Sequence, residues 1–122
     1  ARRLTANATL DDSLFNAEPP SLHGLGYKAG PLNGIWATGP FLHNGSVPTL
    51  WHLLSPPDIR PTTFRVGSRV LDAQNVGFAW QEGTGSFTFD TRLPGNGNGG
   101  HAYGTTLPEA DRRALLAYLK TL

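Results

Sequence analysis

Cysteine and methionine are both absent from the 122 residues of this chain. Without cysteine there is no disulfide and no thiolate metal site, and without methionine there is no thioether ligand for a metal. The formal net charge is only +1, so composition gives no reason to expect nucleic acid or an anionic membrane surface as a partner. No apolar run is long enough to span a bilayer as a helix, and no signal peptide is visible.

Apolar residues are in modest supply, at 39%, whereas glycine and proline are plentiful, with 15 and 10 residues. The length predicts one domain. The apolar fraction is somewhat low for a domain that is stable by itself, and the Gly and Pro content predicts much irregular backbone. We therefore expect a cofactor or a missing partner segment to supply apolar surface that this chain lacks.

The chain is expected to divide into an N-terminal arm, residues 1–26, and a larger portion, residues 27–122. Proline and glycine pairs interrupt the arm, which shows little periodicity. In the larger portion, Pro31 is predicted to open a short helix ending near Trp36, and Asn44-Gly45 is predicted to form a turn. A second short helix is expected over residues 49–54, capped by Thr49 and ended by two prolines.

Residues 63–66 and 86–90 alternate apolar and polar side chains and are predicted to be strands, with a third possible strand over residues 76–80. A sheet of two or three strands is marginal alone and must pack on another element. The glycine-rich run 94–106 lacks the lysine of a phosphate-binding loop, which argues against nucleotide binding. It carries one histidine, His101.

The clearest element is a helix expected over residues 107–122. Thr106 and Glu109 fit a capping box, and Pro108 suits the first turn. Apolar residues follow the helical period at Leu107, Ala110, Ala114, Leu115, Tyr118, Leu119 and Leu122. Docking is expected through Leu115, Tyr118, Leu119 and Leu122.

Three stretches resemble known cytochromes. Residues 27–54, centred on Pro40-Phe41-Leu42-His43-Asn44-Gly45-Ser46, resemble the bacterial dihaem cytochrome c peroxidase family, in a region downstream of the second haem attachment site. The ending Ala117-Tyr118-Leu119-Lys120-Thr121-Leu122 resembles the terminal helix of class I cytochromes c. The run that includes Gly100-His101-Ala102-Tyr103-Gly104 is similar to the branch containing the haem-dependent rubber oxygenases.

This resemblance covers residues 27–122 and implies a mainly α, partial cytochrome c-like fold with long loops and a small β-hairpin. It implies a haem-packing, ligand-supplying part of a periplasmic or secreted bacterial oxidoreductase of the peroxidase or oxygenase type. Its partners would be the remaining, haem-attaching part of the same protein and a small electron-donor protein. The chain alone is expected to be inactive, with catalytic residues elsewhere.

Two departures from the family pattern matter. The motif CxxCH, which attaches haem c, is absent, so the haem c would be attached outside this chain. Methionine is absent from the region near Pro56-Pro57, where many of these peroxidases place a Met ligand. The resemblance therefore points to His101 as the metal ligand, because it stands in the Gly-His-x-Tyr-Gly stretch; the alternative is a solvent-exposed loop histidine.

The other candidate haem-binding residues follow from the resemblance: His43, Phe41, Leu42, Trp36, Lys28 and Tyr103. His43 is expected to bind backbone or a haem propionate, or else to stabilise the turn before Asn44. The apolar members would line a pocket or form an ordinary core. His52 is expected to be structural or at the surface, and His23 has no motif around it.

Two other functions stay open. A haem-free module that keeps the cytochrome framework for binding or assembly is the main alternative, and the missing CxxCH favours it. A non-haem metal enzyme has less support, because the sequence has no HExxH motif and no tight cluster of histidines and carboxylates.

Overall fold

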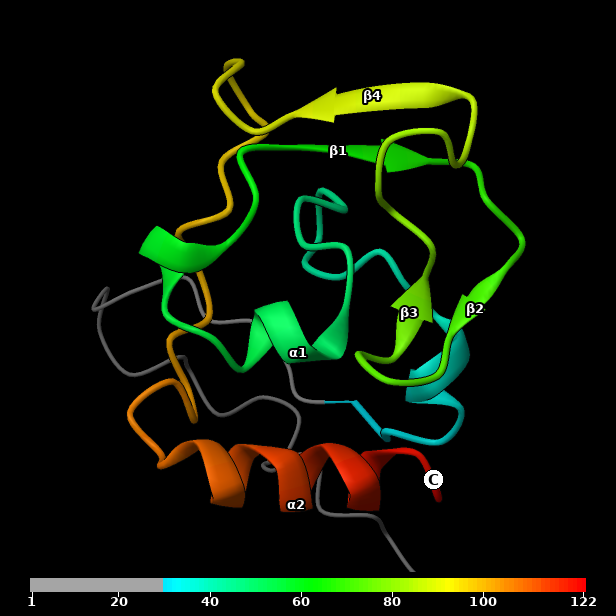
Figure 1. Ribbon diagram of the computed structural model, residues 1–122. Helices are drawn as coiled ribbons and strands as arrows, with labels where there is room; N and C mark the ends of the chain where they lie inside the picture. Colours follow the sequence, from blue (N-terminus) through cyan, green and yellow to red (C-terminus); the bar gives the residue numbers. More distant parts are fainter. Residues whose placement is uncertain (1–29) are drawn as a thin grey trace, which may run out of the picture. The chain divides into compact units, whose positions relative to one another are not determined.

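The computed structural model describes residues 30–122, and Pro31–Leu122 belong to one structural unit (Figure 1). The expected arm, residues 1–26, lies outside the described residues, and so do His23 and Lys28. Along the described part, loops and turns predominate over regular structure.

The expectation of a mainly α fold is wrong for the described residues. They form two α-helices, α1 (Leu50–Leu53) and α2 (Glu109–Leu119), and two 3-10 helices, Ile35–Ala37 and Pro57–Ile59. Helix accounts for about 23% of these residues and strand for about 16%. The low helix content has a physical reason in the middle of the chain. Glycines and prolines there disfavour long helices, and short antiparallel strand pairs form instead.

Two small antiparallel sheets form in this middle region. Strand β1 (Thr63–Val66) pairs with β4 (Phe87–Asp90), and β2 (Leu71–Asp72) pairs with β3 (Gly77–Phe78). The strands predicted over 63–66 and 86–90 are confirmed, and β3 falls within the predicted 76–80. β2 was not predicted.

Cross-strand packing stabilises the larger pair. Phe64 lies opposite Phe89 in the register, and their rings stack with centroids 5.2 Å apart. Phe64 is 2% exposed. Because a two-stranded sheet is marginal by itself, this aromatic contact and the burial of Phe64 account for much of its stability.

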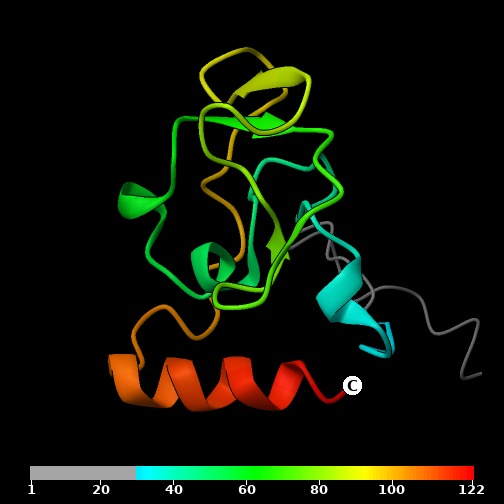
Figure 2. The same ribbon diagram turned by 45° about the vertical axis from the view of Figure 1, so that its right-hand side comes forward.

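The core lies between α1, α2 and the segments that flank α1. Leu50 and Leu54 from the first helical region meet Leu116 and Leu119 of α2, which lies beneath α1 in both views (Figures 1 and 2). The remaining buried members are Phe41, Val47 and Val76. Thr49 caps α1 as predicted, because its hydroxyl oxygen accepts a hydrogen bond from the backbone N–H of His52.

Helix α2 begins later than the sequence pattern suggests. Its N-cap is Pro108, which makes no side-chain capping bond, so the predicted capping box does not form. Leu116 and Leu119 are buried and Leu115 and Leu122 pack against the core, whereas Tyr118 is 59% exposed. The docking face is therefore confirmed for three of the expected residues and wrong for Tyr118.

Replacing Gly77 by alanine should lower the free energy of unfolding by roughly 1–3 kcal/mol. Its β-carbon would lie 2.6 Å from the Pro48 carbonyl oxygen and 3.1 Å from the Thr49 α-carbon. Both are backbone atoms at the start of α1, where Thr49 forms a β-bridge with Gly77. Urea unfolding measures the loss. Gly99→Ala is the matched control because the space around Gly99 is open, and equal losses in both variants would contradict this explanation.

Candidate functional site

The candidate site is built around the glycine-rich loop of residues 95–101, named here the His101 loop. It belongs to the segment that runs from the end of β4 to the start of α2 (Figure 1). Residues 95–101 contain no helix or strand, so other parts of the chain must hold their backbone. Three side chains far away in the sequence do this.

Two of these side chains come from the Asn44-Gly45-Ser46 turn. The Asn44 side-chain amide donates to the carbonyl oxygens of Gly95 and Gly97, at 3.0 and 2.9 Å. The Ser46 hydroxyl, fully buried, donates to the Gly97 carbonyl at 3.0 Å. The predicted turn is confirmed, since Gly45 donates its N–H to Leu42 and has φ of 69°. The turn thus aims both side chains at the loop.

Arg60 is the third side chain, and it is 3% exposed. Its guanidinium donates to three loop carbonyls, those of Asn98, Gly100 and His101, the last two at 2.7 and 2.9 Å. It also donates to three carbonyls at and after the end of α1, those of His52, Leu53 and Ser55. Burial lowers the pKa of Arg60, but a guanidinium stays charged at any pH at which proteins fold.

His101 has a left-handed backbone conformation, with φ of 59°. For a residue with a β-carbon this conformation costs about 1–2 kcal/mol, and it persists only where the surroundings fix it. The side chain is exposed, and its ring meets the Tyr103 ring edge to face at 5.2 Å. Tyr103 itself is 80% exposed. The loop therefore holds an imidazole and a phenol at the surface of the described unit.

The electrostatics of His101 favour a neutral imidazole. Partial burial lowers its pKa, and the positive charge of Arg60 lowers it further. A neutral imidazole has one unprotonated ring nitrogen, which is the form that binds a metal ion. The site can therefore offer a ligand nitrogen at neutral pH.

The other predicted site residues lie in different places. Phe41 is 6% exposed and belongs to the core, and Leu42 is half-buried against it. His43 is exposed in the turn that follows. Trp36 is 40% exposed and lines a small cavity of about 160 Å³. His101 does not line the cavity that contains Trp36.

This cavity lies between the first 3-10 helix, the β2–β3 hairpin and the end of α2, with Leu71, Val76, Gly77 and Lys120 among its walls. It is smaller than the roughly 300–1,000 Å³ of typical ligand pockets and contains no histidine. Within residues 30–122 there is no group of three or more His, Cys, Asp or Glu that could hold a metal ion. This cavity is therefore too small to enclose a haem, and His101 lies outside it.

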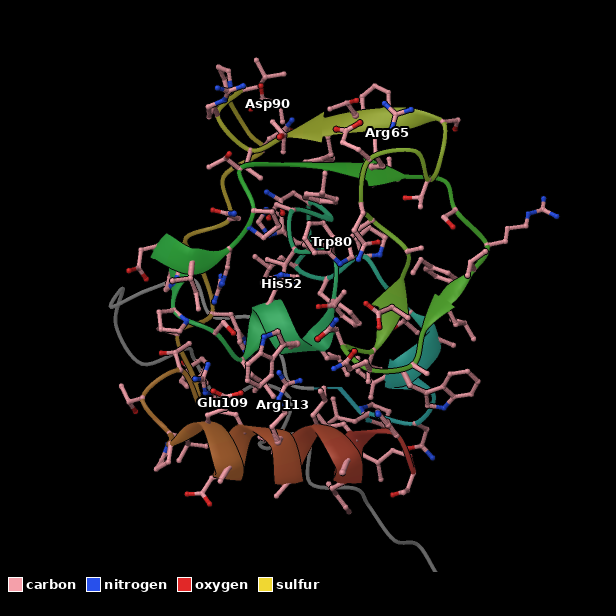
Figure 3. The ribbon with its side chains drawn as sticks, viewed as in Figure 1. His52, Arg65, Trp80, Asp90, Glu109 and Arg113 are labelled. Atoms are coloured by element: carbon pink, nitrogen blue, oxygen red, sulfur yellow. The ribbon has the colours of Figure 1, made fainter. Side chains whose placement is uncertain are left out.

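His52 has a structural role, which is one of the two possibilities expected from the sequence; the other was a surface position. Its Nδ1 lies 2.7 Å from the Thr49 hydroxyl oxygen, and its ring meets Trp80 edge to face at 4.9 Å. Figure 3 shows His52 and Trp80 facing each other between α1 and β1. Burial lowers the pKa of His52 to about 4, so the neutral ring can accept a hydrogen bond from the Thr49 hydroxyl group.

The stability of the fold should fall as the pH drops from 6.5 to about 4. In that window the unfolded chain binds a proton at His52 and the folded chain does not, so acid favours unfolding, by at most about 1.4 kcal/mol per pH unit. Below that window the contribution is constant. Urea unfolding at several pH values measures the slope, and His52→Gln should reduce it. An unchanged slope in the variant would assign the acid sensitivity to other groups.

Arginine–aromatic contacts join α2 to α1. The Arg113 guanidinium lies 3.5 Å from the Trp51 ring centroid and the Arg112 guanidinium 4.8 Å from it. Arg113 also pairs with Glu109 one turn earlier, at 3.5 Å (Figure 3). The two contacts with Trp51 therefore help to hold α2 against α1.

Comparison with known proteins identifies part of this chain. Residues 26–65 match the model of a family described as RoxA-like, cytochrome c-like. This region is therefore cytochrome c-like, and it includes Asn44, Ser46 and Arg60, the three residues whose side chains hold the His101 loop. None of the described helices is both long and apolar enough to cross a membrane.

Two relatives occur in Sinorhizobium fredii (strain NBRC 101917 / NGR234). The uncharacterized protein y4iJ is 51% identical over an alignment of 107 residues that covers 80% of this chain and 18% of that protein. The uncharacterized protein y4iM is 44% identical over 66 residues, which are 54% of this chain and 15% of that protein. The chain thus spans less than a fifth of the length of either relative.

Proposed function

We propose that this chain is part of a longer, haem-bearing oxidoreductase, in which it covers one haem and supplies an axial ligand through His101. One observation carries the proposal. The side chains that tether the His101 loop all come from the cytochrome c-like region, residues 26–65. A cytochrome-like segment thus holds an exposed, neutral imidazole in a fixed conformation.

The residues of this chain would act by position. His101 would bind the iron, Tyr103 would lie beside the ligand, and the core around Phe41 and Leu50 would support the loop from below. His43, Leu42, Trp36 and Lys28 are further proposed contacts to the haem or its propionates. A bound haem supplies one-electron redox chemistry, and ligand type and burial set its potential.

The finer assignments are part of the same proposal. The parent would act on peroxide or dioxygen at another haem, as a member of the dihaem peroxidase family close to the rubber oxygenase branch, and would work in the periplasm. Its haem c would be attached through a CxxCH motif outside these 122 residues, and a small electron-donor protein would reduce it.

The visible absorption spectrum of the purified protein that contains residues 1–122 tests this function. We expect a Soret band that survives denaturation, because thioether bonds keep haem c on the polypeptide. Residues 1–122 expressed alone are the control and should carry no covalent haem, since they contain no cysteine. Absence of a Soret band from the longer protein would contradict the proposal and favour a haem-free binding or assembly module.

A further inference from the structure

Arg60 is an unusual group for a loop-rich chain, because it is a buried cation held by carbonyl oxygens. Among residues 30–122 the ion pairs are Arg92 with Asp90 and Arg113 with Glu109, and Arg60 takes part in neither. Its side chain makes six hydrogen bonds, all to backbone carbonyls. A buried charge is tolerated only when its donors are satisfied, and here they are.

The six acceptors fall into two groups. One group lies at or just after the end of α1 and includes the carbonyls of His52 and Leu53, of which the His52 carbonyl also accepts the backbone N–H of Ser55 at 3.1 Å. The other group lies in the His101 loop and includes the carbonyl of His101 itself, at 2.9 Å. A planar guanidinium donates in fixed directions, so it sets the orientation of these peptide groups relative to α1.

The three tethers of the loop are not equivalent. Asn44 and Ser46 hold Gly95 and Gly97, four or more residues before the histidine. Arg60 holds Gly100 and His101 and therefore fixes the peptide planes on both sides of the His101 α-carbon. The left-handed conformation of His101, which few residues adopt without help, occurs at the point where Arg60 binds.

We propose that Arg60 is a positioning residue that sets the direction in which the His101 imidazole leaves the loop towards the haem iron. This inference rests on the proposed role of His101 as axial ligand. Arg60 would then orient the ligand as well as stabilise the fold. A ligand on an irregular loop needs a fixed backbone if its ring is to reach the iron in one geometry.

The test uses the haem-bearing protein that contains this chain, with Arg60→Lys and Arg60→Gln. Lysine keeps the charge and glutamine keeps two donors, but neither has the planar fork. Arg65→Lys is the matched control, because Arg65 also donates to loop carbonyls, those of Thr84 and Gly85, in the segment between β3 and β4. Electron paramagnetic resonance and the reduction potential report the haem, and urea unfolding reports stability.

We expect both Arg60 variants to show a broadened or shifted low-spin signal, a high-spin fraction and a changed potential, while Arg65→Lys loses stability without these changes. Free imidazole should restore the low-spin signal in the Arg60 variants. An unchanged haem signal in folded Arg60 variants would overturn the proposal, and so would failure of both variants to fold, which would make Arg60 a residue for folding alone. If His101→Ala leaves the wild-type signal intact, the proposed function itself fails, and this outcome is separate from the two above.

Discussion

Leu116→Ala should lower the free energy of unfolding by about 2–5 kcal/mol. Leu116 is 2% exposed and belongs to the same buried cluster as Leu50, Leu54 and Leu119. Removal of its side chain beyond Cβ loses the transfer free energy of the buried groups and leaves a cavity between α1 and α2, which short elements cannot easily close. Urea unfolding followed by circular dichroism measures the change in midpoint.

Tyr118→Ala is the matched control on the same helix. Tyr118 is 59% exposed, so its truncation should change the free energy of unfolding by a small fraction of the Leu116 effect. If the two variants lose equal stability, α2 contacts its surroundings through a different face from the one described. An unchanged midpoint for Leu116→Ala would mean that α2 does not dock on α1.

The sequence predicted most of the regular elements because their signals are local. Strands β1 and β4 alternate in the β period, the Asn44-Gly45 turn has its own chemistry, and Thr49 is a good N-cap. The two-residue strand β2 has no periodicity to detect, and it forms because its partner strand β3 lies next to it. Strand β2 therefore depends on tertiary structure and could not be predicted from its own residues.

The terminal helix shows where a periodic pattern misleads. Leu107 and Tyr118 fit the apolar stripe, yet Leu107 precedes the first residue of α2 and Tyr118 faces outward. Leu116 does not fit the predicted stripe and is the most deeply buried residue of the helix. Because two adjacent leucines point about 100° apart on a helix, only the position of α1 decides which one is central.

The predicted fold class was wrong because it was taken from the helical cytochromes that the chain resembles. In the described residues, side-chain contacts between distant segments hold a largely irregular backbone. The contacts of Asn44, Ser46 and Arg60 with the His101 loop join residues about 40 to 50 positions apart, and no local pattern encodes them. The sequence around Arg60 did not single it out as a site residue. The nearby run Ser55-Pro56-Pro57 gave no sign that its side chain turns inward.

His101→Ala has the second large expected effect. In the haem-bearing protein it should convert one six-coordinate, low-spin haem to a high-spin or water-ligated form, because alanine offers no ligand atom and these 122 residues contain no methionine to replace the histidine. His52 is a poor substitute, since its Nδ1 faces the Thr49 hydroxyl and its ring packs on Trp80. The described fold should survive the change, because the His101 side chain is exposed.

The most direct measurement is the electron paramagnetic resonance spectrum of that protein as wild type, His101→Ala and His43→Ala. The spectrum of His101→Ala should lack one low-spin signal, and His43→Ala should keep that signal with small shifts, since the variant keeps Asn44 and Ser46, which tether the His101 loop. The reverse result, with His43 required and His101 dispensable, would contradict the account and assign the ligand to the His-Asn-Gly motif.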